Sequence, residues 1–185
     1  MTLRFKASLI LATSRIFTSL SAGVNAASQA QAADAFDLIP ERPLSVYVDV
    51  TATHVPIESS PHSTDSVFID VDHEGDLDWV VSVEHGVNRL YLNNGKGRLT
   101  NKPDAFGKVI HDSEHVRAAN FKGDSNMDVV FVAEADEVHQ LFLGDGKGSF
   151  TDVSDRLPAT SQGNGLAFGD VNGDNLPDII IGSTG

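Results

Sequence analysis

Residues 70–78 read DVDHEGDLD, which places five carboxylates within nine positions directly before the apolar run WVV. Like charges this close repel one another, so the cluster is costly unless a cation or solvent offsets the repulsion. The acids alternate along the segment, counted from Asp70 as position 1, and Gly75 at position 6 permits a sharp turn. Calcium takes about six to eight oxygen ligands, which a loop with alternate acidic side chains supplies. The spacing therefore predicts a calcium loop.

The ligands expected in this loop are the side chains at positions 1, 3, 5 and 9 and the backbone carbonyl at position 7. They are Asp70, Asp72, Glu74, Asp78 and the carbonyl of Asp76. An EF-hand needs a bidentate Glu at position 12, where this chain has Val81. The following residues, WVVSV, are β-branched and aromatic, which predicts a strand instead of an exiting helix. The alternative interpretation is a solvated acidic turn without metal.

The nine-residue frame returns twice at a fixed spacing. Residues 120–128 read NFKGDSNMD before VVFV, and residues 170–178 read DVNGDNLPD before IIIG. The frames begin at residues 70, 120 and 170, so the period is 50 residues in both steps. RLYLNNGKGRLT, from residue 89, also recurs as QLFLGDGKGSFT from residue 140, and VDVT, from residue 48, recurs as TDVS from residue 151. Three matched elements in one order predict a repeat protein.

Each repeat is predicted to be all-β. In the first, four short antiparallel strands, SVFID, DWVVSVE, RLYLN and RLTN, are joined by the acidic loop and by the turns HGVN and NGKG. Asn-Gly and Asp-Gly followed by more glycine tolerate the positive φ of tight hairpins. Four short strands in about 50 residues match one β-propeller blade. The chain is predicted to hold about two and a half blades, at residues 46–100, 101–150 and 151–185, the last incomplete.

The repeated frame resembles the FG-GAP/VCBS repeats of integrin α-subunit heads and of many secreted bacterial proteins. The resemblance rests on the pattern D-x-[DN]-x-[DE]-x-x-x-D, the apolar strand after it and the turn N-x-L-Y-x-N-x-G-x-G-x-F. LAFGDVNGDNLPDIIIG, residues 166–182, carries it most clearly. The resemblance covers roughly residues 46–185. It implies a β-propeller whose blades hold calcium in the loop between their first two strands.

The three loops, called loop one, two and three in chain order, differ in their ligands. Loop three is predicted to bind calcium through Asp170, Asn172, Asp174, the carbonyl of Leu176, and Asp178. Loop two is predicted to be weak or empty, and its candidate ligands are Asn120, Asp124, Asn126 and Asp128. The reason is Lys122 at position 3, whose ammonium repels a divalent ion and can neutralise Asp124 and Asp128. Asn175 replaces glycine at position 6 of loop three, and Asn tolerates left-handed geometry.

Residues 1–32 are predicted to be an export signal. MTLRFK is basic, ASLILATSRIFTSLSAG is apolar apart from Arg15, and AQA at residues 30–32 fits an A-x-A cleavage site. The alternative is an amphipathic or disordered leader. The apolar stretch is too short and too interrupted to span a bilayer as a helix. We therefore expect a secreted, periplasmic or cell-surface protein without a membrane span, with a linker at residues 33–45.

The composition agrees with an exported calcium protein. The net charge of −13 argues against a nucleic-acid partner. Many of the acids lie in the three loops, so bound calcium would offset part of the self-repulsion. Extracellular modules bind calcium at about 10⁻⁴ to 10⁻³ M, which suits weak sites. The chain has no cysteine and so no disulfide, which leaves bound calcium to stabilise the β-turns.

No catalytic constellation is predicted, and the chain is expected not to be an enzyme. HDSEH, residues 111–115, formally matches the H-x-x-E-H metalloprotease pattern, but that chemistry needs both histidines on one helical face, and the segment reads as an inter-blade loop. GDGKGS, from residue 144, lacks phosphate-loop spacing and is a repeated hairpin turn. The other histidines are expected in solvated loops: His54, His62, His73, His85 and His139.

The predicted function is a binding, adhesion or scaffold module for an extracellular protein or glycan. The alternative is an accessory or catalytic propeller of a secreted polysaccharide-active enzyme, since fold does not decide function. Trp79, the single tryptophan, is expected to pack within its blade. The strand DIII, residues 178–181, is expected to expose an unpaired edge, so further blades or self-association are expected.

Overall fold

The computed structural model describes residues 10–12, 47–56, 62–135, 138–157 and 161–183. Within these ranges the only helical elements are α1 (Thr51–His54) and η1 (Ser154–Arg156), so the all-β prediction is confirmed. None of the described helices is long and apolar enough to cross a membrane. A unit of residues 8–51 holds β1 (Ile10–Ala12) and β2 (Tyr47–Asp49), which pair antiparallel. Apart from β1, the expected export signal and linker lie outside the described residues.

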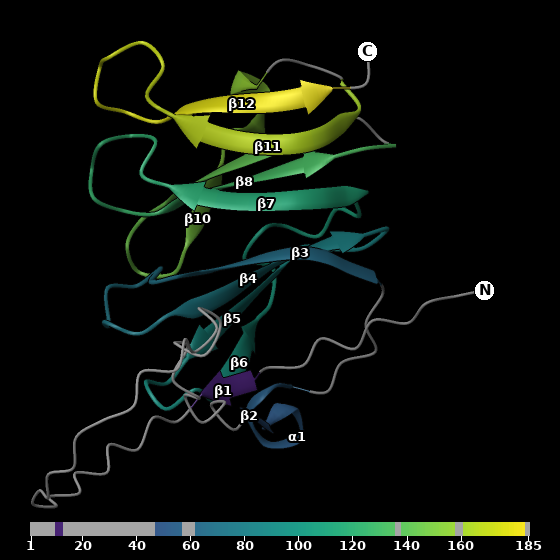
Figure 1. The fold of residues 1–185 in the computed structure, drawn as a ribbon, viewed down its shortest axis with the longest axis vertical. Coiled ribbons are helices and arrows are strands. Elements are labelled where there is room, and N and C mark those ends of the chain that lie inside the picture. Colours follow the sequence, from purple (N-terminus) through teal and green to yellow (C-terminus); the bar gives the residue numbers. More distant parts are fainter. Residues whose placement is uncertain (1–9, 13–46, 57–61, 136–137, 158–160, 184–185) are drawn as a thin grey trace, which may run out of the picture. The chain divides into compact units, whose positions relative to one another are not determined.

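The second unit contains three sheets, one for each predicted blade (Figure 1). Blade one consists of β3 (His62–Ile69), β4 (Asp78–Glu84), β5 (Arg89–Asn93) and β6 (Leu99–Lys102) in that order. Blade two repeats the order with β7 (Ser113–Ala119), β8 (Asp128–Ala133), β9 (Gln140–Gly144) and β10 (Phe150–Asp152). Blade three contains β11 (Gly163–Gly169) and β12 (Asp178–Ser183). All pairings are antiparallel, and the sheets resemble propeller blades in a ring that is not closed.

Strand β8 shows why the blades stack. It reads DVVFVA and is buried along its whole length. Successive side chains of a strand point to opposite faces. Val129 and Phe131 accordingly join the core shared with blade one, while Val130 joins the core shared with blade three. A strand covered on both faces needs a continuous apolar run, and VVFV supplies one.

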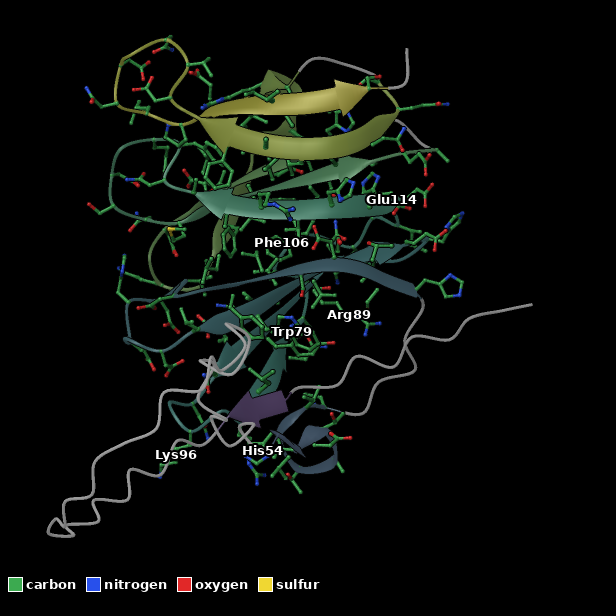
Figure 2. The ribbon with its side chains drawn as sticks, in the orientation of Figure 1. His54, Trp79, Arg89, Lys96, Phe106 and Glu114 are labelled. Carbon is green, nitrogen blue, oxygen red and sulfur yellow. The ribbon has the colours of Figure 1, made fainter. Side chains whose placement is uncertain are left out.

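Phe106, in the connection between β6 and β7, completes the core between blades one and two (Figure 2). Its ring centroid lies 4.9 Å from that of Phe131, 5.1 Å from that of Phe142 and 4.9 Å from that of Phe150. Burying such a ring stabilises the fold by about 1.5–3 kcal/mol, and favourable ring geometry adds about 0.5–1.5 kcal/mol. The link between the blades is therefore part of the core.

Trp79 packs within blade one, as predicted (Figure 2). It lies on β4 opposite Phe68 of β3 and Tyr91 of β5. The ring centroids are 6.1 Å apart for Phe68 and Trp79 and 5.2 Å apart for Trp79 and Tyr91, and both pairs are stacked. Directly opposed aromatic pairs stabilise antiparallel sheets. The tryptophan therefore joins three strands of one blade.

Buried polar contacts link the blades, and one of them corrects the sequence analysis. Asn88 Nδ2 donates a hydrogen bond to Ser113 Oγ at 2.9 Å between blades one and two. His139 is the residue 51 positions after Asn88. Its Nε2 lies 2.8 Å from the Oγ of Ser161, which precedes the first strand of blade three. His139 is only 5% exposed, so the expectation of a solvated loop position is wrong. A buried histidine needs a hydrogen-bond partner, and the neighbouring blade supplies it.

Strand β12 pairs with β11 and with no other described strand. Phe168 on β11 is 42% exposed and Ile180 on β12 is 47% exposed, whereas the corresponding sheet of blade two is largely buried. An exposed apolar edge is a template for pairing with another strand. Self-association through this edge stays a prediction.

Candidate metal centre

The three acidic loops lie along the same edge of successive blades, each between the first two strands of its sheet (Figure 1). Loop one also contacts blade two directly. The Gly148 N–H donates to the Val71 carbonyl at 3.0 Å, and His73 Nε2 lies 3.0 Å from Asn126 Oδ1 of loop two. The loops therefore form a continuous row instead of isolated turns.

The backbone takes the same course in all three loops. Position 6 is Gly75, Ser125 or Asn175, with φ of +85°, +72° and +68°. The predicted turn at this position, including the left-handed asparagine, is confirmed. Position 4 also has positive φ, which the sequence analysis missed: it is glycine in loops two and three, but His73 at +62° in loop one. Glycine at position 4 of two loops was the available signal.

The aspartate at position 9 closes each loop. Its Oδ2 accepts the backbone N–H of position 2, in the pairs Val71–Asp78 at 3.0 Å, Phe121–Asp128 at 2.9 Å and Val171–Asp178 at 3.0 Å. Its Oδ1 accepts an N–H at the end of the third strand in blades one and two, from Asn93 at 2.8 Å and from Gly144 at 2.9 Å. Burial raises the pKa of the Asp78 and Asp128 carboxyls. The ligand predicted at this position is therefore also a structural anchor.

Loop one brings three of its acids together. Asp70, Asp72 and Asp78 each place a carboxylate oxygen within 4.8 Å of the other two. Asp70 Oδ2 accepts the Gly75 N–H at 3.0 Å, while its buried Oδ1 has no hydrogen-bond partner among the described residues. An unsatisfied buried polar atom costs about 1–3 kcal/mol, and more when charged. A cation between these oxygens would remove that cost, and an all-oxygen donor set suits calcium.

Two further predicted ligands of loop one lie outside this group of three. The Glu74 side chain is exposed, and its backbone N–H donates to Asp72 Oδ1 at 3.3 Å. Asp76 is half-buried, and the predicted ligand there is its backbone carbonyl. Coordination by Glu74 and Asp76 stays a prediction.

Loop two has an ammonium group where loop one gathers carboxylates. Lys122 Nζ lies 2.6 Å from Asp124 Oδ2 and 3.8 Å from Asp128 Oδ1, and donates to the Gly144 carbonyl at 2.9 Å. The hydrogen bond from Lys122 is the main reason that the pKa of Asp124 is lowered. The two asparagines of the loop also bond to Asp124. The backbone N–H of Asp124 donates to Asn120 Oδ1 at 3.1 Å, and Asn126 Nδ2 donates to Asp124 Oδ2 at 3.1 Å. The expected pairing of the lysine with both aspartates is confirmed.

Loop three directs its first carboxylate to its own backbone. Asp170 accepts the N–H groups of Gly173 at 2.6 Å, Asp174 at 3.2 Å and Asn175 at 2.9 Å. These hydrogen bonds lower the pKa of the Asp170 carboxyl, and the bond from Asn175 has the largest effect. Among the described residues, Asp170, Asp174 and Asp178 do not form a group with oxygens within 4.8 Å of one another.

The amide of loop three lies between two of its predicted ligands. Asn172 Oδ1 accepts the Asp174 N–H at 2.9 Å, and Asn172 Nδ2 donates to Asp178 Oδ1 at 3.2 Å. The Leu176 N–H donates to Asp174 Oδ1 at 2.8 Å. Calcium coordination by loop three, including the carbonyl of Leu176, stays a prediction. It requires Asn172 to turn its oxygen, instead of its NH₂ group, toward the ion.

The HDSEH segment is not helical. Its last three residues begin strand β7, so the expectation of an inter-blade loop is wrong for this part. His115 lies on β7, and His111 lies before it in an isolated bridge with Gly86, so the two histidines do not share the helical face that the metalloprotease pattern needs. The segment therefore does not form that arrangement.

Two stretches of the chain, residues 70–131 and 121–181, match the FG-GAP-like repeat family. Together they cover more than half of the chain. Each match begins in an acidic loop and extends past the next one into the strand that follows it. No curated protein matches the chain.

Replacing Asp70 by Asn is expected to remove one calcium site, because it deletes the buried carboxylate of loop one. Isothermal titration should show the stoichiometry falling by one, or affinity at that site falling roughly tenfold or more. Asp170→Asn is expected to remove the second site. Asp124→Asn in loop two is the matched control and should leave calcium binding unchanged. Wild-type binding in Asp70→Asn would contradict the assignment of loop one.

Converting loop two to the charge pattern of loop one is expected to create a further calcium site. The double variant Asn120→Asp, Lys122→Asp removes the ammonium group and supplies acids at positions 1 and 3. Titration should then show one more bound calcium than in the wild-type protein. Asn120→Asp combined with Lys96→Asp is the control, because it changes the net charge equally while keeping Lys122 (Figure 2 shows Lys96). Equal stoichiometry in the two variants would show that Lys122 does not decide metal binding.

Proposed function

The chain belongs to the FG-GAP-like repeat family, and we propose that it is an exported, calcium-binding propeller module that binds an extracellular protein or glycan. The observation that carries the proposal is the group of Asp70, Asp72 and Asp78, with its buried and unsatisfied oxygen. Export is supported by the basic start of the chain, the apolar stretch after it and the AQA signal.

Calcium in loop one would stabilise the fold and would also order the row of loops. Its charge would offset the mutual repulsion of the carboxylates. Loop one is bonded to blade two through the Val71 carbonyl and Gly148, and to loop two through His73 and Asn126. Fixing loop one therefore also fixes the edge that it forms with its neighbour. Pre-ordered loops bind a ligand with less loss of conformational entropy.

The loop row also exposes apolar side chains. Leu77, Val171 and Leu176 are 55%, 71% and 36% exposed, and all three lie in acidic loops. Apolar contacts ringed by polar groups are the usual composition of a binding surface. The proposed role is therefore binding through the loop edge, without chemistry on the ligand.

Calcium is expected to raise the melting temperature relative to EDTA. A ligand at about 100 times its Kd adds about 2.7 kcal/mol, equivalent to about 5–10 °C for a chain of this size. The difference should shrink on acidification. Burial raises the pKa of Asp78, so this carboxyl takes up a proton earlier than an ordinary aspartate. Protonation weakens calcium binding, and the folded state without calcium gains stability as pH falls through the raised pKa.

Scanning calorimetry between about pH 4 and pH 7.5, with calcium or with EDTA, measures both effects, because the ordinary pKa of an aspartate is about 3.9. Asp70→Asn is the control and should show a smaller calcium shift at every pH. A melting temperature indifferent to calcium and EDTA would leave loop one as a solvated acidic turn.

Ligand binding is expected to depend on calcium, because the ion orders the loop edge. The protein would be applied to arrays of glycans and of purified extracellular-matrix proteins, with calcium or with EDTA. Binding should appear with calcium, disappear with EDTA and weaken in Asp70→Asn, but persist in Asp124→Asn. Binding to neither array, or binding that ignores calcium and the loop one variant, would contradict a calcium-dependent binding module.

A further inference from the structure

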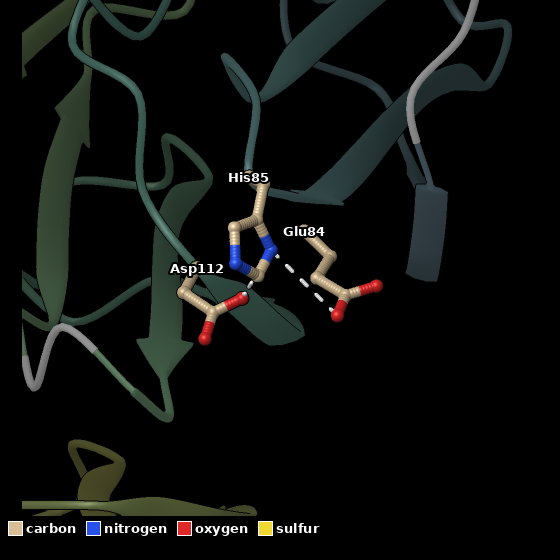
Figure 3. A group of neighbouring side chains, drawn as sticks. All are labelled: Glu84, His85 and Asp112. Carbon is tan, nitrogen blue, oxygen red and sulfur yellow. Dashed lines mark ion pairs between the residues drawn. The ribbon is translucent and has the colours of Figure 1, made fainter.

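A second group of metal-ligating side chains lies at the end of blade one opposite to the acidic loops. Glu84, His85 and Asp112 meet there, where blade one adjoins blade two (Figure 3). Glu84 ends β4, a strand of seven residues that begins at Asp78 of loop one. At about 3.3 Å per residue, the group is roughly 20 Å from loop one. It is therefore separate from the calcium ligands.

The three ligand atoms converge closely. His85 Nδ1 lies 3.1 Å from Asp112 Oδ1 and 3.6 Å from Glu84 Oε1. One ligand atom from each of the three residues lies within 4.8 Å of the other two. A tetrahedral ion with ligands at about 2.0–2.2 Å separates its ligand atoms by about 3.3–3.5 Å. The two measured distances bracket that value. Small side-chain adjustments would therefore place an ion among the three atoms.

The chain holds these side chains in place through the contact between the blades. Gly86 and His111 exchange two backbone hydrogen bonds, at 3.2 Å and 3.1 Å, which bring the end of β4 beside Asp112. Asp112 is only 7% exposed, and its Oδ2 accepts the Ala135 N–H at 3.0 Å. That bond orients Asp112 Oδ1 toward His85. Hydrogen bonds of this kind fix metal ligands before the ion arrives.

The surroundings favour a cation. Glu114 and Glu134 lie near the group and add negative charge to it (Figure 2 shows Glu114). His62 Nδ1 contacts the other oxygen of Glu84 at 3.1 Å. On the neighbouring strand β7, the side chains of His115, through Nδ1, and of Arg117 both contact the Asp65 carboxylate.

The ligand set is not a feature of the repeat. Counting 50 residues on from Glu84, His85 and Asp112, the corresponding residues are Glu134, Ala135 and Gln162. One carboxylate is kept, whereas the imidazole and the other carboxylate are absent from this second set. The acidic loops recur in every blade, so this group has a role that the blade scaffold does not require.

We propose that Glu84, His85 and Asp112 form a second metal site, which takes a divalent transition ion such as zinc. One imidazole nitrogen with two carboxylate oxygens suits zinc, whereas calcium prefers oxygen alone. An open depression of about 280 Å³ gives access to the group, and His85, Ile110, His111, Asp112 and Ala135 line it. Water entering through this depression would complete the coordination.

Zinc titration of the calcium-saturated protein tests the site, because excess calcium occupies the acidic loops. We expect one zinc ion per chain in the wild-type protein. His85→Gln is expected to weaken zinc binding at least tenfold. The side chain of His85 is 70% exposed, so this substitution should leave the melting temperature without zinc unchanged. His54→Gln removes a histidine outside the group and should bind zinc as the wild-type protein does (Figure 2 shows His54).

Cobalt in place of zinc gives an independent readout, since tetrahedral nitrogen and oxygen ligation produces visible absorption bands that His85→Gln should lose. The inference is overturned if His85→Gln binds zinc like the wild-type protein, or if calcium displaces the zinc, which would place the zinc in the acidic loops. It is equally overturned if no zinc binds, in which case Glu84, His85 and Asp112 are only a polar contact between the two blades. Asp70→Asn should retain zinc binding, so failure of the calcium proposal would be recognised separately.

Discussion

The buried carboxylate of the position 9 aspartate is the interaction on which the repeats depend. In blades one and two this carboxylate joins the start of the acidic loop to the end of the third strand, through Asp78 and Asp128. A buried carboxylate is expensive unless donors satisfy it, so the loop and the strand must approach it together. The acidic loop and the sheet are therefore one folding constraint. In blade three, Asp178 is only half-buried, and the Asn172 amide donates to its Oδ1.

Because the aspartate fixes the loop backbone, the remaining loop residues can vary in how their charge is offset. The three loops share their left-handed positions but offset the charge of their carboxylates differently. Loop one leaves a buried oxygen of Asp70 available to a cation, loop two inserts the ammonium of Lys122, and loop three directs backbone N–H groups to Asp170. A carboxylate group that can receive a cation, a lysine and backbone donors are thus three arrangements that answer one electrostatic problem. The blade is preserved in each case.

The repeat spacing made most of the fold predictable, because each strand and each loop has a counterpart at a fixed distance in the sequence. The strands of blades one and two, the turn at Asn175 and the packing role of Trp79 all follow from local pattern. The features that the sequence did not reveal depend on contacts between blades. His139 is buried because Ser161 lies across the interface, and nothing in its own surroundings indicates this. Likewise, 27 residues separate His85 from Asp112, and no ligand motif has that spacing.

The two ends of the blades are under different constraints, and this difference bears on where specificity arises. At the loop end, the position 9 aspartate accepts the backbone N–H of position 2 in every blade, so the loop backbone is kept while the charge balance changes. At the opposite end, blades one and two are joined by backbone hydrogen bonds between Gly86 and His111 and by the side-chain bond from Asn88 to Ser113. Other residues at this end differ from their counterparts 50 residues on, as the pairs His85–Ala135 and Asp112–Gln162 illustrate. The side chains of His85 and Asp112, which distinguish this blade interface from the next, therefore lie at the end away from the acidic loops.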